Sequence, residues 1–127
     1  VADVDDQVIG YVSYSPIFLQ SDVSISGYIL APLGVSPEHQ KQGVGSHLIT
    51  SGIDMLTQDG GSVLLVYGDP NYYGRFGFTE AIGRIFVPPY PLEYPFGWTG
   101  MMLNGTALPD IPITFECVAA LSKPELW

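Results

Sequence analysis

The sequence predicts a single α/β domain, and three observations carry this prediction. An extended apolar run, Tyr28 to Val35, gives way to a helical pattern of apolar residues from Val44 to Gln58. A continuous apolar run, Ser62 to Tyr67, follows, as expected of a buried central strand in a β-α-β unit. With 127 residues and 46% hydrophobic content, the chain can fill one core but not two. We therefore expect one domain over residues 1–127.

Two strands precede the predicted helix. Gln7 to Ser15 has the composition of a strand, and Val23 to Leu30 has the composition of another. Ser15-Pro16 marks the start of the connection between them. A β-meander is therefore expected to open the chain.

The second strand is expected to become irregular over residues 31–35. Pro32 has no N–H to donate to a ladder, and Gly34 weakens strand pairing, so regular pairing should fail here. The backbone N–H groups of Leu33 and Val35 would then be free for a ligand.

A glycine-rich turn, Gln40 to Gly45, connects this segment to the helix. Its two glycines let the backbone approach a ligand, and the helix start adds free N–H groups and a positive dipole end. Such a turn typically holds a phosphate or pyrophosphate. Four side chains nearby are further donors: Gln40, Lys41, Gln42 and Ser46. We predict an anion site for a nucleotide-like cofactor, with the helix ending at Gly60-Gly61.

Two familiar phosphate motifs do not fit this turn. A dinucleotide fingerprint needs a third glycine where Leu48 stands, and a P-loop needs Lys and Ser or Thr after Gly45. His39 and His47 lack the Cys or carboxylate neighbours of a metal site, and His47 is expected on the helix surface.

A short helix is predicted after the central strand. Asp69 is placed as its N-cap, Pro70 takes the first helical position, and Gly77 ends it.

The last third of the chain is expected to be less regular. Ala81 to Gly97 is rich in Pro and aromatics and predicts a packed loop with a brief strand at Ile85 to Val87. Trp98 to Leu103 and Ile113 to Ala120 are predicted as two closing strands around a turn at Asn104-Gly105.

Charge and composition exclude several classes of protein. The net charge of −9 would repel a phosphate backbone, so we expect no nucleic-acid partner. No apolar stretch reaches the ~18 residues of a membrane helix, so a soluble protein is expected. The single cysteine, Cys117, lies in an apolar run, which favours a buried thiol in a reducing, cytoplasmic setting.

Two motifs together resemble the GNAT superfamily of N-acetyltransferases. These are Gln40-x-x-Gly43-x-Gly45 after a strand and, later, Tyr73-x-x-x-Gly77-Phe78. The resemblance covers Gln7 to about Leu121. It implies a GNAT-like mixed, mostly antiparallel sheet whose splayed central strands admit acetyl-CoA, with flanking helices and no metal.

The resemblance also implies a set of ligand-binding residues. The glycine-rich turn would wrap the pyrophosphate, and the irregular strand end would pair with the amides of the pantetheine arm as a further strand does. The implied coenzyme contacts are Leu33, Gly34, Val35, Gln40, Lys41, Gln42, Gly43, Val44, Gly45, Ser46 and Tyr73.

Catalytic roles follow from the same resemblance. Tyr73 matches the tyrosine that protonates the departing thiolate, which is reasonable because a phenol of pKa ~10 can donate to a thiolate whose thiol is near ~8.5. The backbone N–H of Leu33 would polarise the thioester carbonyl and stabilise the oxyanion. For Tyr72, packing is the expected role.

No general base emerges from the sequence. Some family members carry a carboxylate at the position of Leu30 or Ala31, and neither residue can act as a base. Asp69 is better explained as a helix cap, and Glu116 is a candidate only through a water.

The expected activity is acetyl transfer from acetyl-CoA to a primary amine on a small-molecule or peptide acceptor, by direct attack in a ternary complex. Because the chain opens at what resembles the family's second strand, either upstream residues are missing or another element, such as a second copy in a homodimer, completes the site. The main alternative is a non-catalytic acyl-CoA-binding or regulatory module. A hydrolase or nucleotide-binding domain is a weaker one, since no Gly-x-Ser-x-Gly elbow is present.

Overall fold

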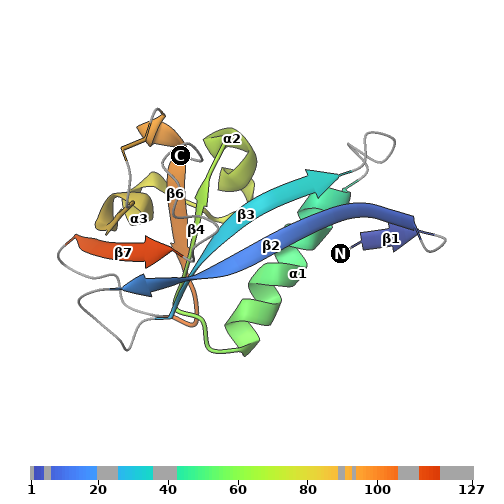
Figure 1. Cartoon of the computed structure of the whole chain (residues 1–127), viewed down its shortest axis with the longest axis horizontal. Coiled ribbons are helices and arrows are strands. Elements are labelled where there is room, and N and C mark those ends of the chain that lie inside the picture. Colours follow the sequence, from blue (N-terminus) through green and yellow to red (C-terminus); the bar gives the residue numbers. More distant parts are fainter. Residues whose placement is uncertain are drawn as a thin grey trace.

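The computed structural model describes residues 2–4, 7–19, 26–35, 43–88, 91–92, 94–105 and 112–117. These residues form a twisted seven-stranded sheet flanked by helices (Figure 1). The strands are β1 (Ala2–Val4), β2 (Gln7–Leu19), β3 (Gly27–Val35), β4 (Val63–Tyr67), β5 (Phe86–Val87), β6 (Trp98–Met102) and β7 (Ile113–Cys117). The helices are α1 (Val44–Gln58), α2 (Pro70–Tyr73) and α3 (Glu80–Ile85), with 3-10 turns η2 (Gly74–Phe76) and η3 (Pro95–Gly97).

The sheet is mixed and mostly antiparallel, as predicted. Its strand order is β5-β7-β2-β3-β4-β6, and β1 pairs with β2 outside this path. Two pairs are parallel, β3 with β4 and β5 with β7, and the other pairs are antiparallel. Among the described residues, no helix is long and apolar enough to cross a membrane.

Strand β4 separates two hydrophobic cores. Val63 and Leu65 belong to the α3-side core, where Ile82 and Ile85 of α3 pack against them. Leu64 and Val66 belong to the α1-side core, which also contains Ile49 and Leu56 of α1 and is contacted by side chains of α2. Because side chains alternate along a strand, α1 and α2 lie on one face of β4 and α3 on the other. Burial on both faces explains why β4 is a continuous apolar run.

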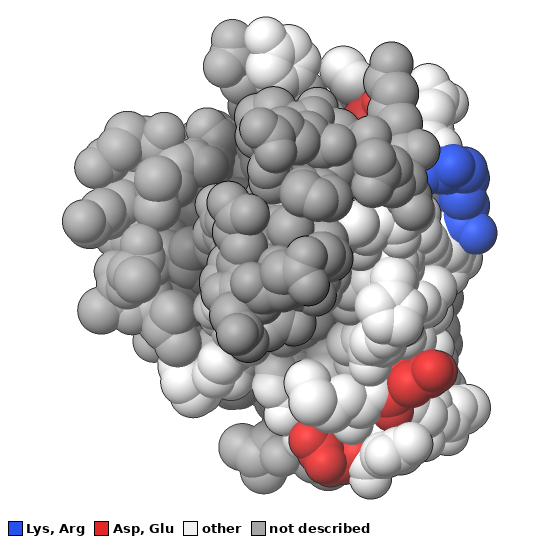
Figure 2. All heavy atoms as spheres, turned by 90° about the vertical axis from the view of Figure 1, so that its right-hand side faces the viewer, with Lys and Arg blue, Asp and Glu red and all other residues white. Residues whose placement is uncertain are grey.

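The predicted helix from Val44 to Gln58 has the bounds that the sequence indicated. Its buried face carries Leu48, Ile49, Gly52 and Leu56. Figure 2 views the side of the molecule at which α1 begins and shows on that face one small basic area, with most of the visible acidic surface below it. The apolar spacing alone therefore sufficed to place this helix and its inner face.

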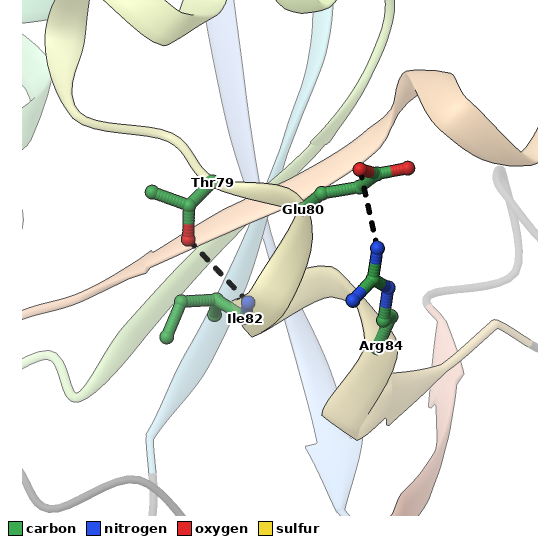
Figure 3. Close-up of polar contacts among 4 residues, drawn as sticks. All are labelled: Thr79, Glu80, Ile82 and Arg84. Atoms are coloured by element: carbon green, nitrogen blue, oxygen red, sulfur yellow. Dashed lines mark hydrogen bonds and ion pairs between the residues drawn. The ribbon is translucent and has the colours of Figure 1, made fainter.

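One helix was missed, because residues 81–85 were expected to lie in a loop. Thr79 caps α3 by accepting a hydrogen bond from the Ile82 N–H at 3.4 Å (Figure 3). Arg84 pairs with Glu80 one turn earlier at 3.4 Å, on the exposed face. Gly83 lets the helix approach the backbone of Trp98, where a β-carbon would collide. The features that stabilise α3 are a cap, an ion pair within one turn and a close backbone contact. The sequence therefore shows no long apolar repeat that would predict this helix. The brief strand expected at Ile85 to Val87 is present as β5 over Phe86–Val87, whereas Ile85 is the last residue of α3.

Two further predictions need correction, and one strand was not predicted. β2 continues through Pro16 to Leu19, because Ile17 is buried and β7 supplies a second partner from Ile17 onward. β1 was not predicted, since three residues are too few to show a pattern. The closing strands do not pair with each other in the described part of the chain: β6 pairs with β4, and β7 pairs with β2 and β5.

The remaining late features agree with the sequence where they are described. Asn104 and Gly105 form the predicted turn, with φ angles of 57° and 65°. Two predicted strand ends, residues 23–25 and 118–120, lie outside the described residues, as does the side chain of Cys117.

Candidate functional site

The site is built around the place where β3 and β4 part. Their parallel ladder pairs Gly27–Leu30 with Val63–Val66 and ends there. β3 nevertheless continues to Val35 and stays paired with β2. Among the described residues, the β3 edge that faces β4 therefore has no strand partner over residues 31–35. The predicted loss of pairing is correct for this edge and wrong for the β2 edge.

An irregularity in β3 accompanies this parting. Leu33 pairs with Val12 and Leu30 pairs with Tyr14, so the register shifts between them. β3 thus places Ala31 and Pro32 opposite the single residue Ser13, which is the arrangement of a β-bulge. Proline fits such a position because it has no N–H to give to the ladder.

The start of α1 offers backbone donors to an anion. Gly43 adopts a left-handed φ of 84° as the N-cap, and a β-carbon there would have no heavy atom within 4 Å. Among the described residues no side chain caps this helix start, and its first turn carries no acidic residue. The N–H groups of Val44, Gly45 and Ser46 belong to the first turn, where no intrahelical acceptor exists. An anion placed there gains these donors and the positive end of the helix.

Part of the predicted anion site lies outside the described residues. Gln40, Lys41 and Gln42 of that site are not described, and neither is the nearby His39. His47 is exposed on the surface of α1, as expected. Within the described residues, no group of His, Cys, Asp or Glu side chains could hold a metal ion.

Tyr73 is held on α2 at the end of β4. Asp69 caps this helix by accepting the N–H of Asn71 at 2.9 Å, as the Asp69-Pro70 pair predicted. The Tyr73 ring is partly buried and meets Tyr72 edge-on at 5.0 Å and Phe78 at 5.9 Å. Arg75 lies 4.7 Å from the centre of the Tyr72 ring, which agrees with a packing role for Tyr72.

The hydroxyl of Tyr73 stays protonated at neutral pH. Within the described part of the chain, no hydrogen bond engages it. Burial raises the pKa of Tyr73, and the neighbouring Tyr72 phenol raises it further. A raised pKa keeps this phenol protonated over the whole neutral range.

A second phenol, Tyr14 of β2, was not identified from the sequence. Its hydroxyl donates to the carbonyl oxygens of Leu48 and Ile49 at 3.2 and 3.3 Å. Its ring occupies the space that a side chain at Gly52 would need. Burial raises the pKa of Tyr14 to about 12, with a smaller contribution from Tyr73. Tyr14 therefore fixes α1 to the sheet on the same face as Tyr73.

Three of the predicted site elements converge. β3 and β4 run parallel, so their carboxyl ends reach the same edge of the sheet. At that edge lie the backbone of Leu33–Val35, the start of α1 after β3, and Tyr73 after β4. The structure brings no general base to this edge among the described residues: Leu30 is 4% exposed in the core, and Asp69 serves as a cap. Glu116 lies on β7 opposite Phe18, and its side chain is outside the described residues.

Curated relatives share this sequence over much of its length. The uncharacterized N-acetyltransferase YhbS of Escherichia coli K12 is 38% identical over 79 residues, covering 62% of this chain and 47% of the relative. The uncharacterized N-acetyltransferase YjhQ of the same organism is 34% identical over 111 residues, covering 86% of this chain and 61% of the relative. The chain thus spans about half to three fifths of the length of these relatives.

Solved structures show the same fold. The crystal structure of E. coli YhbS in complex with CoA has a TM-score of 0.80 and 30% identity, covering 91% of this chain and 63% of that one. A GNAT acetyltransferase from Brucella melitensis in complex with acetyl-CoA has a TM-score of 0.65 and 28% identity, covering 89% and 62%. The family model described as "Acetyltransferase (GNAT) domain" matches residues 1–80. The chain therefore belongs to the GNAT family of acetyltransferases.

Proposed function

We propose that this protein is an N-acetyltransferase that moves an acetyl group from acetyl-CoA to a primary amine. The observation that carries the proposal is the parting of β3 and β4 beside a helix start whose N-cap is Gly43. The similar proteins from E. coli and B. melitensis were solved with CoA and acetyl-CoA, which supports the same ligand here.

The described residues fit the shape and charge of this cosubstrate. The unpaired β3 edge at Leu33, Gly34 and Val35 can pair with the amides of the pantetheine arm, as an added strand would. The first turn of α1, Gly43 through Ser46, can donate to the diphosphate. Gln40, Lys41 and Gln42 precede that turn in the sequence and would add side-chain donors.

Two groups would assist the acetyl transfer: the backbone N–H of Leu33 and the phenol of Tyr73. Acetyl-CoA supplies the acyl thioester when bound. The Leu33 N–H donates to the thioester carbonyl oxygen, where negative charge develops. As the acceptor nitrogen bonds to the acetyl carbon and the carbon–sulfur bond breaks, Tyr73 donates its proton to the sulfur. The proton lost by the amine passes to solvent, which also restores the phenol.

Holding donor and acceptor together accounts for much of the expected rate. A direct attack in a ternary complex needs both reactants aligned, and such alignment is a large proximity effect. The contacts with the diphosphate lie far from the reacting atoms, and their binding energy serves to hold the thioester in position for attack by the amine.

A second candidate function is a non-catalytic acyl-CoA-binding module. It is favoured by one observation: the strand position that carries a carboxylate in some family members is occupied by Leu30 and Ala31. Such a module would bind the coenzyme and release no thiol with any amine.

The test uses titration and turnover on the intact protein. Calorimetry with acetyl-CoA measures binding, and thiol release in the presence of a panel of primary amines measures transfer. Binding with amine-dependent thiol release supports the enzyme. Binding with none supports the non-catalytic module, and no association with acetyl-CoA overturns both.

A cytoplasmic location and assembly as a homodimer belong to the same proposal. A single cysteine suits a reducing compartment. Light scattering on the purified protein tests whether two copies associate.

A further inference from the structure

An open groove of about 370 Å³ lies at the end of β4. This volume falls within the range of ~300–1,000 Å³ that is typical of small-molecule sites. The groove is lined by residues from β4, the start of α2 and the segment before β6: Tyr67, Gly68, Asp69, Pro70, Tyr94, Phe96 and Gly97.

The groove lies across β4 from Tyr73. The side chain of Tyr67 packs against the α3-side core, whereas Tyr73 packs against the α1-side core. Gly68 lies between the groove and the Tyr73 ring. It lines the groove, and a β-carbon on it would collide with that ring. The backbone that separates the groove from the phenol thus carries no side chain at this point. The groove and the Tyr73 ring therefore both contact Gly68, so a ligand in the groove lies close to the segment that carries Tyr73.

Aromatic side chains form one wall of the groove and are held there by backbone contacts. Tyr94 and Phe96 are 54% and 58% exposed, and their rings meet edge-on at 5.9 Å. The Tyr94 N–H donates to the Tyr67 hydroxyl at 2.8 Å, and the Gly68 N–H donates to the Gly97 carbonyl at 2.9 Å. Exposed, ordered rings of this kind offer flat apolar surface and attract cations to their faces.

The charged group in the lining is a carboxylate. Asp69 is exposed, and its Oδ1 accepts the Asn71 N–H at the start of α2; within the described part of the chain its second carboxylate oxygen has no hydrogen-bond partner and can accept from a ligand. The chain as a whole carries a charge of −9. A cationic amine is therefore attracted to this groove, and a ligand with a carboxylate or phosphate is repelled.

A larger groove of about 600 Å³ is less suited to the acceptor. It is lined by α3 and the proline-rich segment, and its basic group, Arg84, is paired with Glu80. None of its lining residues belongs to α2 or to the end of β4.

We infer that the groove beside Gly68 binds the acceptor, and that this acceptor is a cationic primary amine carrying an aromatic ring or a similar flat apolar group. The ring lies against Tyr94 and Phe96, Asp69 attracts the ammonium group, and the deprotonated amine is held beside Gly68, next to the residue that contacts Tyr73. This inference rests on the proposed function, because it assigns the second substrate of the same reaction.

The experiment compares three amines at saturating acetyl-CoA: phenylethylamine, butylamine and phenylalanine. Butylamine lacks the ring, and phenylalanine adds a carboxylate. We expect kcat/KM for phenylethylamine to exceed both others by about tenfold or more, the size of an aromatic contact or a local charge effect. Equal values for the three amines would overturn the assignment.

Two variants locate the effect. Asp69→Asn keeps a residue that caps helices equally well and removes the charge, so KM for phenylethylamine should rise about tenfold with little loss of stability. Phe96→Ala should raise the same KM. Phe18→Ala is the matched control, because Phe18 is similarly exposed, at 55%, and lies on β2. Unchanged KM in both groove variants would contradict the inference.

Failure of the inference can be told apart from failure of the proposed function. If acetyl-CoA binds and other amines are acetylated, but the groove variants behave like Phe18→Ala, the acceptor assignment fails and the enzyme stands. Binding of phenylethylamine can also be followed without turnover, through NMR shifts of the Gly68 and Gly97 amides. Shifts at these amides support the groove even if acetyl-CoA does not bind, and their absence at saturating amine counts against it.

Discussion

The ring of Tyr73 lies close against Gly68, and a β-carbon on residue 68 would stand 2.6 Å from the ring's Cε2 atom. Gly68→Ala should therefore displace the phenol. If Tyr73 acts as the proton donor, kcat should fall by about 10–10²-fold, since a shift of about 1 Å in a catalytic group can cost that much. Binding of acetyl-CoA should change little.

The control for this substitution is Gly74→Ala. A β-carbon on Gly74 would have no heavy atom within 4 Å, although the residue directly follows Tyr73. Steady-state kinetics should show near-normal turnover for this variant. A similar loss in both variants would mean that the contact with Tyr73 is not the cause.

Removing the hydroxyl alone gives a sharper test of Tyr73. Tyr73→Phe keeps the ring contacts and should lower kcat by about 10²–10⁴-fold, the usual contribution of a general acid, with acetyl-CoA affinity nearly unchanged. The pKa of Tyr73 is raised by burial and by Tyr72, so the acid form persists and the wild-type rate should fall only above about pH 10. Undiminished turnover of the variant would remove the assigned role.

The helix start can be tested by crowding it. Gly45→Val places a branched side chain in the first turn of α1, where the diphosphate is expected, and should weaken acetyl-CoA binding about tenfold, or ~1.4 kcal/mol. Ser51→Val adds the same side chain to an exposed position on the same helix. Calorimetry should find that only the first substitution reduces affinity; equal affinities would move the ligand elsewhere.

The hydrogen bonds of Tyr14 predict a stability effect. Tyr14→Phe removes donation to the Leu48 and Ile49 carbonyls and should lower the free energy of unfolding by about 0.5–1.5 kcal/mol at neutral pH. The folded-state pKa is about 12, above the ordinary 10.0. Because the folded-state pKa is raised, the protonated Tyr14 contributes its full stabilisation of the fold below pH 10. This contribution to the free energy of unfolding is lost as the pH rises toward 12.

Denaturant titrations across that window provide the measurement. Wild-type stability should decline between pH 10 and 12, because the folded state holds its proton where the unfolded state has lost it. Tyr14→Phe should show a shallower decline, with Tyr73 still contributing. Parallel slopes for the two proteins would show that the phenol is not protected by folding.

The parts of this fold that could be predicted are those set by local periodicity or caps. The bounds of α1 follow from apolar residues at helical spacing, and α2 follows from Asp69 and Pro70. The end of regular pairing beside β4 follows from Pro32 and Gly34. In each case the signal lies within a few neighbouring residues.

The parts that could not be predicted depend on contacts between distant segments. Tyr14 meets the carbonyl of Leu48 across 34 positions, and Tyr94 meets Tyr67 across 27. Nothing near Tyr94 in the sequence indicates that it lines a groove at the end of β4. A glycine directly after the central strand was the one available signal, because Gly68 marks a close approach of other atoms.

The separation of β3 from β4 after Leu30 has a kinetic consequence. Among the described residues no interstrand hydrogen bonds link β3 to β4 beyond Leu30, so coenzyme association should proceed as one second-order event without a slow opening phase. Evolutionary selection on residues 31–35 would then act mainly on how readily the chain folds with β3 and β4 apart, and much less on how these strands move.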